Sequence, residues 1–438
     1  MRIDRLRVQN FKKFAEQTFA LHPQFTLLAG ENGSGKTSVL DALAVAAGIW
    51  LVKPPDTTLL HNSRRNILEK EIRLQGIPAG DRVQFLQQRP VAVTATGEIG
   101  KQDHLTWTRQ ITTKGKITNN SEAQRALSVI ADIYARVAKG QHMLCPVLAY
   151  YGAGRAWLPS SKRKKEKSNG GPARRWAAFY DCFNERIRFD ELRKWFHRET
   201  TAAGNRGGRM RPGFEVVKRA VLRCVPKADA LWFDPDQEQV VLSIEGQAQP
   251  LDNLSAGQRV MLALVADIAI KAVTQNAFLL PAEELGPEDE PLPRLLQKTP
   301  GMVLIDELDV HLHPSWQRRV AADLKETFPK IQFVATTHSP QVVGELPTEQ
   351  ISVLEGGFVY SPEHSFGVDS SRILENIMAT KPRTESIHNL LTQLARQIGD
   401  DDFNGARVTI QEAEAKLGRD DPEVIRALTL MDFMEQKS

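Results

Sequence analysis

The stretch that decides the fold is Gly30-Glu31-Asn32-Gly33-Ser34-Gly35-Lys36-Thr37, which matches the pattern GxxxxGK[ST]. It follows a short apolar run, Phe25 to Ala29, and opens a helical pattern from Thr37 to Ala47. Glycines let backbone N–H groups wrap around phosphates, and a helix N-terminus favours their negative charge. The sequence therefore predicts a phosphate-binding loop between a strand and a helix, within an α/β fold.

The chemistry of this motif gives individual loop residues a role. Lys36 is expected to reach the β- and γ-phosphates of a nucleotide, and Thr37 to hold Mg²⁺ through its hydroxyl group. The residues predicted to contact the nucleotide are Gly30, Asn32, Gly33, Ser34, Gly35, Lys36, Thr37 and Ser38. A chance glycine-rich turn is the competing interpretation, and the strand and helix patterns on either side disfavour it.

Two adjacent carboxylates follow a second apolar run. Met302 to Ile305 reads as a buried strand, and Asp306 and Glu307 come directly after it. Mg²⁺ prefers oxygen ligands, so Asp306 fits the acid that holds the metal. Glu307 is placed to take a proton from an attacking water. Two acids after a strand also occur as plain surface residues, but the phosphate loop elsewhere in the chain favours the catalytic interpretation.

Two further motifs are weaker when taken alone. Ser255, Gly257 and Gln258 precede an apolar helical pattern from Val260 to Val273. A Ser and a Gly at a helix N-terminus form an anion site, whereas the alternative is an ordinary N-cap at Ser255. His338 comes just after a strand pattern, where its ring can donate to a γ-phosphate oxygen. A structural histidine is the alternative there.

Composition narrows the class of protein. The chain has 438 residues, enough for two or three folding units, and a formal net charge of +4. Its three cysteines are far apart and form no CxxC pair, which disfavours a disulfide framework or a structural zinc site. The longest apolar stretch, Ala42 to Val52, is shorter than the ~20 residues that cross a bilayer. We therefore expect a cytoplasmic protein with no membrane span.

Charge is distributed unevenly along the chain. The segment from Ser160 to Arg223 holds 18 Lys or Arg against 7 Asp or Glu, so the remainder of the chain is acidic. A basic segment of this kind is a candidate surface for nucleic acid. A solvated, flexible loop is an equally good interpretation, and the sequence does not decide between them.

The ordered set of the four motifs resembles the ATP-binding-cassette (ABC) ATPases. More narrowly, it resembles the branch that contains the structural-maintenance-of-chromosomes (SMC), RecF and overcoming-lysogenization-defect proteins. Three stretches are similar to AAA-type ATPases of bacterial anti-phage systems, in particular the PtuA-like ATPases of Septu and retron systems. They are Tyr150 to Arg155 (YYGAGR), Asp306 to Pro314 (DELDVHLHP) and Phe366 to Asp369 (FGVD).

The resemblance implies a shared site between two copies. The copies pack head to tail, and ATP on one phosphate loop is covered by Ser255 and Gly257 of the other copy. His338 is then the switch histidine at the γ-phosphate, and Asp309 to His313 form the loop that crosses the interface. Ala256 stands where the family more often has glycine. No residue could be assigned to the glutamine loop of the family.

The resemblance also implies an architecture: a P-loop NTPase of the ABC type, with a mixed sheet and flanking helices. Four regions are expected. Residues 1–157 form an N-terminal lobe with the phosphate loop, and 158–228 a basic, partly helical insertion. Residues 229–360 form a C-terminal lobe with the signature, the acidic pair and the switch histidine. Residues 361–438 form a helical segment for partner binding or oligomerisation.

The function that the resemblance implies is an ATP-hydrolysing regulatory subunit of an anti-phage defence complex, using ATP and Mg²⁺. A separate nuclease of the HNH type is the expected partner, in some systems with a retron RNA–DNA product, because no nuclease motif is recognised in this chain. A DNA repair or maintenance ATPase of the RecF type, without a nuclease partner, is the alternative. Chromosome-organising proteins carry long coiled-coil arms, which this sequence lacks.

Overall fold

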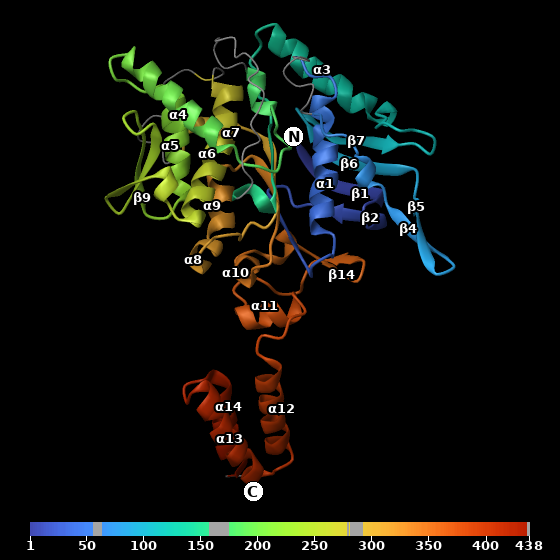
Figure 1. Ribbon diagram of the computed structural model, residues 1–438, viewed down its shortest axis with the longest axis vertical. Helices are drawn as coiled ribbons and strands as arrows, with labels where there is room; N and C mark the ends of the chain where they lie inside the picture. Colours follow the sequence, from blue (N-terminus) through green and yellow to red (C-terminus); the bar gives the residue numbers. More distant parts are fainter. Residues whose placement is uncertain (56–63, 157–174, 278–279, 281–291, 436–438) are drawn as a thin grey trace. The chain divides into compact units, whose positions relative to one another are not determined.

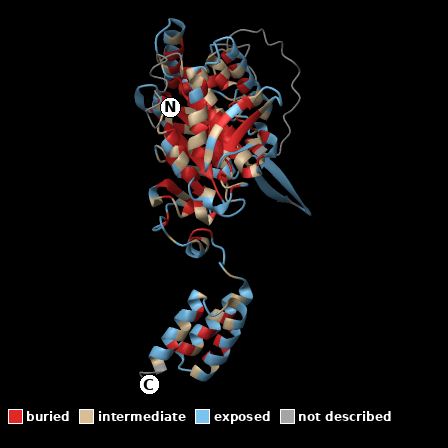
Figure 2. Cartoon of the chain, turned by 90° about the vertical axis from the view of Figure 1, so that its left-hand side faces the viewer, coloured by how far each residue is buried: buried red, intermediate tan, exposed pale blue. Residues whose placement is uncertain are grey.

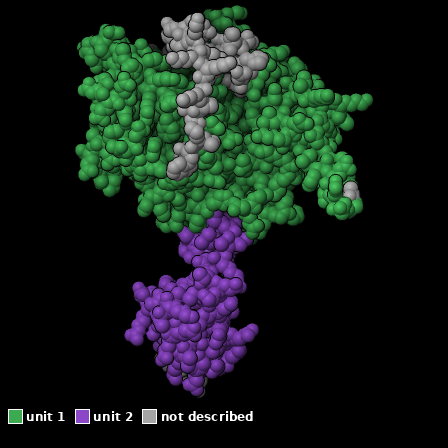
Figure 3. All heavy atoms as spheres, viewed as in Figure 1, with its two compact units in different colours: residues 1–368 green, residues 369–438 purple. Residues whose placement is uncertain are grey.

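The computed structural model describes residues 1–55, 64–156, 175–277, 280 and 292–435 (Figure 1). The chain divides into two compact units, Met1–Val368 and Asp369–Ser438 (Figure 3). The division therefore comes a few residues after the predicted start of the C-terminal segment at 361. The finer four-region division stays a prediction.

A six-stranded sheet lies at the centre of the first unit. Its order is β15 (Phe358–Tyr360), β14 (Ile351–Glu355), β3 (Phe25–Ala29), β13 (Ile331–Thr336), β12 (Gly301–Ile305) and β8 (Val147–Tyr151). All neighbouring pairs are parallel except β14 with β15. Every residue of β3, β8, β12 and β13 is buried, as expected for parallel strands that are covered on both faces.

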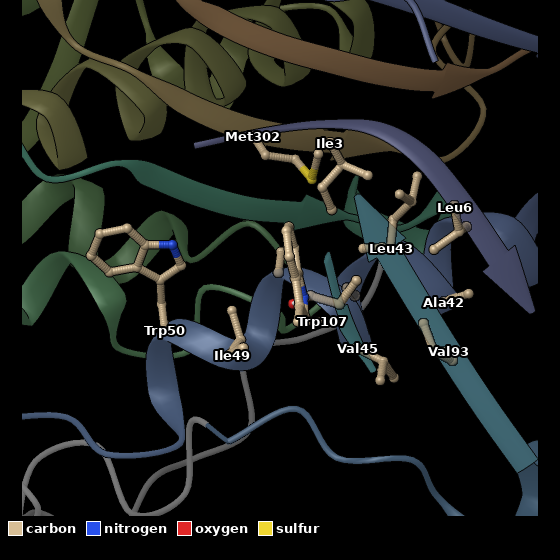
Figure 4. Close-up of a cluster of buried hydrophobic side chains, with 14 of the residues drawn as sticks. Ile3, Leu6, Ala42, Leu43, Val45, Ile49, Trp50, Val93, Trp107 and Met302 are labelled. Carbon is tan, nitrogen blue, oxygen red and sulfur yellow. The ribbon is translucent and has the colours of Figure 1, made fainter. Parts of the chain in front are cut away.

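A second, antiparallel sheet covers helix α1 (Lys36–Ala47) from the other side. Its order is β2 (Phe14–Ala20), β1 (Arg2–Phe11), β6 (Val91–Ile99) and β7 (Gln102–Ile111). The helix contacts β12 and β13 of the central sheet and β1, β6 and β7 of this one. It is therefore buried almost all round, and its apolar side chains join a core that includes Trp50, Trp107 and Met302 (Figure 4).

Helices and a third sheet complete the first unit. α5 (Pro212–Cys224) packs against α6 (Ala256–Asn276), α9 (Val320–Thr327) and β9 (Ala228–Asp234). β9 pairs with β10 (Gln239–Ile244), which pairs with β11 (Gln247–Pro250). The other helices here are α3 (Gln124–Ala138), α4 (Phe189–Gly204), α7 (Arg294–Lys298), α8 (Pro314–Gln317) and α10 (Pro340–Val343).

The pattern of apolar residues from 176 to 196 predicts a helix, and this prediction is wrong in its middle. Only a 3-10 turn, Arg175–Phe179, precedes α4, which begins at Phe189. The intervening chain bonds to the free edge of β8: Tyr150 N donates to Cys182 O, and Gly152 N to Glu185 O, both at 2.8 Å. This long-range pairing overrides the local helical pattern.

The Gly- and Arg-rich stretch from 200 to 213 predicts irregular structure, and this prediction is wrong at both ends. Helix α4 continues to Gly204, and α5 begins at Pro212. A hairpin of β4 (Leu74–Ala79) and β5 (Arg82–Gln87) was not predicted, because Pro78 interrupts its strand pattern. In Figure 2 this hairpin extends from the body with exposed residues along β5.

The second unit consists of helices. They are α11 (Ser370–Asn376), α12 (Glu385–Gly399), α13 (Phe403–Leu417) and α14 (Pro422–Glu435). Leu394, Ile398, Ile410 and Met431 form a small core between the last three. The stretch from Gly418 to Pro422 predicts a turn between the last two helices. The turn is confirmed, since α13 ends at Leu417 and α14 begins at Pro422.

In the part of the chain that the structure describes, no helix is both long enough and apolar enough to cross a membrane.

Candidate functional site

The phosphate loop connects β3 to α1 as predicted, and its glycines are required by its backbone. Gly30, Gly33 and Gly35 have φ of 138°, 76° and 107°, a region that other residues rarely adopt. A Cβ atom at Gly30 would also lie 2.3 Å from the carbonyl oxygen of Leu354 in β14. The loop therefore needs glycine both for its conformation and for its close approach to the neighbouring strand.

Lys36 folds back over the loop that precedes it. Its Nζ donates to the carbonyl oxygens of Gly30 at 2.7 Å and Glu31 at 2.9 Å. Burial lowers the pKa of Lys36, although Asp306, Glu307 and Asp309 act in the opposite direction. Taking an ammonium group out of water is unfavourable unless negative charge lies close by. A bound phosphate supplies that charge.

Asp306 is held between two hydroxyl groups. Thr37 Oγ1 lies 3.0 Å from its Oδ2, and Thr336 Oγ1 lies 2.6 Å from its Oδ1. The carboxylate is 8% exposed. Thr37 belongs to the first turn of α1 and Asp306 to the end of β12, so the fold brings together the two predicted metal ligands. Paired hydroxyl and carboxylate oxygens are the donors that Mg²⁺ prefers.

A nucleotide also fits the loop itself. Among the described residues, the buried Ser34 Oγ has no hydrogen-bond partner. Buried hydroxyl groups are normally paired, and a phosphate oxygen in the loop would provide the missing acceptor. Asn32 and Ser38 lie in the loop and in the first turn of α1, at the positions that the motif predicts.

Glu307 lies beside Asp306 in a constrained turn. Its φ is 50°, in the left-handed region, and its backbone N–H donates to Thr336 Oγ1 at 2.7 Å. The N–H of Leu308 donates to the carbonyl of Thr336 at 2.8 Å. Left-handed backbone in a residue other than glycine is costly and is found where surrounding bonds enforce it, often at functional sites.

His338 is exposed at the end of β13, the strand next to β3 and its phosphate loop. Asp309 fixes the segment that carries it: its Oδ1 accepts hydrogen bonds from Thr337 Oγ1 at 2.5 Å and from His338 N at 3.2 Å. The predicted switch histidine thus lies at the same sheet edge as Lys36 and the acidic pair.

The predicted signature segment, Leu254 to Gln258, forms the N-terminal cap of α6. Ser255 Oγ accepts from Gln258 N at 3.3 Å, and Gln258 Oε1 accepts from Ser255 N at 2.9 Å, which is a reciprocal capping box. Gly257 packs closely, since a Cβ there would lie 2.6 Å from the carbonyl oxygen of His311. The N-cap interpretation of Ser255 is confirmed, and Ser255 itself is exposed. Its contact with a second copy stays a prediction.

Two residues to which the sequence assigned no role in the site also shape it. Thr336 bonds to both acids of the pair, as described above. Arg155, at the end of the motif YYGAGR, donates to the carbonyl oxygens of Asp306 and Glu307. The sequence Gly152-Ala153-Gly154 before Arg155 follows the end of β8. Its position beside the acids depends on β8 pairing with β12, which the sequence alone did not reveal.

Comparison with known proteins supports a nucleotide-binding site. Residues 5–199 match the family model "AAA domain". Residues 242–344 match the model "AAA domain, putative AbiEii toxin, Type IV TA system".

Among curated proteins, "Retron Ec83 probable ATPase" of Escherichia coli is 38% identical over 143 residues, which are 32% of this chain and 24% of that protein. "Septu protein PtuA" of Bacillus mycoides (strain KBAB4) is 25% identical over 360 residues, 80% of this chain and 40% of that protein. The chain thus spans less than half the length of these relatives. Among solved structures, the "SMC head domain from Thermotoga maritima" is 14% identical with a TM-score of 0.43, covering 83% of this chain and 100% of that one.

Proposed function

We propose that this chain, an ABC-type AAA ATPase that resembles the retron ATPases and PtuA, is the ATP-hydrolysing regulatory subunit of an anti-phage defence complex. The ATPase proposal depends on one observation: the hydroxyl groups of Thr37 and Thr336 both bond to the carboxylate of Asp306. Glu307 lies next to this carboxylate, and its N–H bonds to Thr336. The defence role is supported by the similarity to retron and Septu proteins.

Each residue then has a defined task. The loop from Gly30 to Thr37 binds the phosphates, with Lys36 exchanging a carbonyl partner for a phosphate oxygen. Thr37 and Asp306 hold Mg²⁺, which offsets charge on the β- and γ-phosphates. Glu307 orients the attacking water and takes its proton. His338 donates to the γ-phosphate.

We infer that the working form is a head-to-tail dimer, with homo-oligomers built from such pairs. The exposed Ser255 lies at the N-terminus of α6, a 21-residue helix whose first-turn N–H groups favour an anion. Its hydroxyl group bonds only weakly within the cap, at 3.3 Å from Gln258 N. It can therefore turn towards a phosphate of the partner copy.

The effector is proposed to be a separate HNH-type nuclease. The unit Asp369–Ser438 is a candidate for partner binding because it forms its own small core and bears none of the predicted catalytic residues. The deciding test is reconstitution. An HNH-type nuclease that co-purifies with this chain should cut nucleic acid under the control of the ATP state of the complex, and Glu307→Gln should change that control. A nuclease that is indifferent to the nucleotide leaves the RecF-type alternative in place.

Nucleic acid, including a retron RNA–DNA product, is proposed to bind within 160–223. In the described part of this region, several of the arginines that give it its positive charge are already paired with acids. Arg193 pairs with Asp252, Arg211 with Glu199, and Arg223 with Glu326. The run Lys162-Arg163-Lys164-Lys165 lies outside the described residues, and the proposal is directed at that run.

A further inference from the structure

Arg155 is a buried arginine that contacts the catalytic turn only through the backbone. It is 1% exposed. Its Nη1 lies 2.6 Å from the carbonyl oxygen of Asp306, and its Nη2 lies 2.9 Å from that of Glu307. One guanidinium group thus holds two successive peptide groups of the turn that carries both acids.

The position of Arg155 follows from the sheet. β8 pairs in parallel with β12, and Tyr151 O accepts from Asp306 N at 2.8 Å. The chain then turns through Gly152, whose carbonyl accepts from Arg155 N at 3.1 Å and from its Nη1 at 3.3 Å. The described start of the loop after β8, from Gly152 to Arg155, is therefore tied to the end of β12.

A role in stability alone is a poor explanation for this residue. Burial lowers the pKa of Arg155 to about 10, while Asp309, Asp306 and Glu307 act in the opposite direction. Among the described residues, its Nε has no hydrogen-bond partner and no carboxylate bonds to the guanidinium group. Removing the guanidinium group would leave the carbonyl oxygens of Asp306 and Glu307 without this donor, which costs stability. Its placement on the peptide groups of both acids gives it a second role, which is what it positions.

What it positions is a residue in an unfavourable conformation. Glu307 has a φ of 50°. Its N–H is held by Thr336 Oγ1 and its carbonyl by Arg155. Without the second bond, the turn is free to relax, and the carboxylate moves with it. Displacements of about 1 Å in a catalytic group can cost ~10²-fold in rate.

We infer that Arg155 is a positioning residue that sets Glu307 for proton abstraction during ATP hydrolysis, an assignment that rests on the proposed function. It acts through the backbone of Glu307: among the described residues, its guanidinium group donates to the carbonyl oxygens of Gly152, Asp306 and Glu307. Nucleotide affinity should change little on its removal, because the carboxylate of Asp306 keeps its bonds to Thr37 and Thr336 and because Lys36 lies on another element.

The test compares Arg155→Met and Arg155→Lys with Arg109→Met. Arg109 is a matched control: it is also 1% exposed and donates to two backbone carbonyls, those of Val45 and Arg65, and burial lowers its pKa to about 9. It bonds at the far end of α1 and not at the catalytic turn. Steady-state hydrolysis gives kcat and KM, and thermal unfolding corrects for the folded fraction.

Arg155→Met should lower kcat by about 10- to 100-fold with ATP affinity unchanged within ~3-fold. Arg155→Lys should recover part of the rate, because an ammonium group can still reach one carbonyl. Arg109→Met should change unfolding temperature but not kcat. The inference is overturned if the Arg155 variants lose no more kcat per folded molecule than Arg109→Met. If Arg155→Met does not fold, Arg155→Lys alone decides by the same comparison.

A double-mutant cycle isolates the mechanism. With Glu307→Gln already present, Arg155→Met should lower the residual rate by less than ~2-fold, since the group that it positions is gone. Equal loss in both backgrounds overturns the inference. Failure of the proposed function is distinguishable, because the wild-type chain would then hydrolyse no ATP and Glu307→Gln would change nothing.

Discussion

The hydroxyl group of Thr336 lies 2.6 Å from Oδ1 of Asp306. The hydroxyl oxygen of Thr336 also accepts a hydrogen bond from the N–H of Glu307 at 2.7 Å. A single side chain at the end of β13 therefore orients both acids at the end of β12. The parallel register, which pairs Ile305 with Ala335, sets this distance before any ligand binds.

Thr336→Val should disrupt this arrangement without changing the shape of the residue. It leaves the N–H of Glu307 unpaired next to a buried carboxylate, which costs about 1–3 kcal/mol. We expect a lower unfolding temperature and a kcat reduced by at least ~10-fold, a barrier increase of about 1.4 kcal/mol. Thr336→Ser, which keeps the hydroxyl group, should retain most of both. Equal effects of the two variants would show that the hydroxyl group is not what matters.

Glu307→Gln should keep ATP binding and slow hydrolysis by ~10²–10⁴-fold, the usual contribution of a general base. The amide has the same shape as the carboxylate but accepts no proton at neutral pH. Single-turnover hydrolysis and binding of a fluorescent ATP analogue separate the two steps. Glu349→Gln, at an exposed acid outside the site, is the control. If Glu307→Gln hydrolysed ATP at the wild-type rate, Glu307 would not be the general base.

Ser255→Asp should block ATP-dependent dimerisation while leaving the chain folded. Aspartate is as good an N-cap as serine, but its charge would face a phosphate of the partner copy. Ser255→Asn, a neutral N-cap, is the matched control. Sedimentation velocity in the Glu307→Gln background, with and without ATP, measures the association. If Ser255→Asp associates as well as Ser255→Asn, the phosphate does not meet this residue.

Charge reversal of Lys162, Arg163, Lys164 and Lys165 to Glu should weaken nucleic-acid binding and flatten its dependence on salt. Each lost phosphate contact lowers the slope of log K against log salt by about 0.9 on duplex DNA. Reversal of Lys101, Lys114, Lys116 and Lys139, which are exposed elsewhere, changes net charge equally and is the control. Filter binding at several salt concentrations gives the slope. Equal slopes for the two variants would return the run to the solvated-loop interpretation.

Leu394→Ala should destabilise the second unit by about 2–5 kcal/mol, because Leu394 is 1% exposed in a small core. Nucleotide affinity should not change, since the phosphate loop belongs to the other unit. Hydrogen exchange of α12 to α14 reports the first effect, and ATP titration the second. A parallel loss of ATP affinity would show that the two units are energetically coupled.

The sequence predicted those parts of the site that depend on local chain geometry. Gly30 to Thr37 form a strand–loop–helix motif that folds within a few residues, and the position of Asp306 follows from the apolar run before it. Thr336 and Arg155 could not be assigned, because their roles depend on which strands are neighbours. Sheet order is a property of the whole fold, and nothing in YYGAGR alone indicates that β8 lies beside β12.

The fold shows the same limit. Short, fully apolar runs predicted the parallel strands correctly, because a strand that is buried on both faces consists of apolar residues without alternation. The chain from 182 to 185 lies within a pattern that predicts a helix, yet its carbonyl groups accept hydrogen bonds from the edge of β8. A free strand edge offers backbone hydrogen bonds that compete with helix formation, and a local sequence pattern does not reveal this competition.

The close packing of Gly257 against the carbonyl of His311 has a kinetic consequence. Gly257 is proposed to face the nucleotide of the partner copy, while His311 follows Glu307, the proposed general base of its own molecule. Closure on one nucleotide would thus be transmitted to the other, and turnover should rise with ATP concentration with a Hill coefficient above 1. A heterodimer with one Glu307→Gln subunit would then turn over at less than half the wild-type rate, because a single stalled site would hold the pair closed.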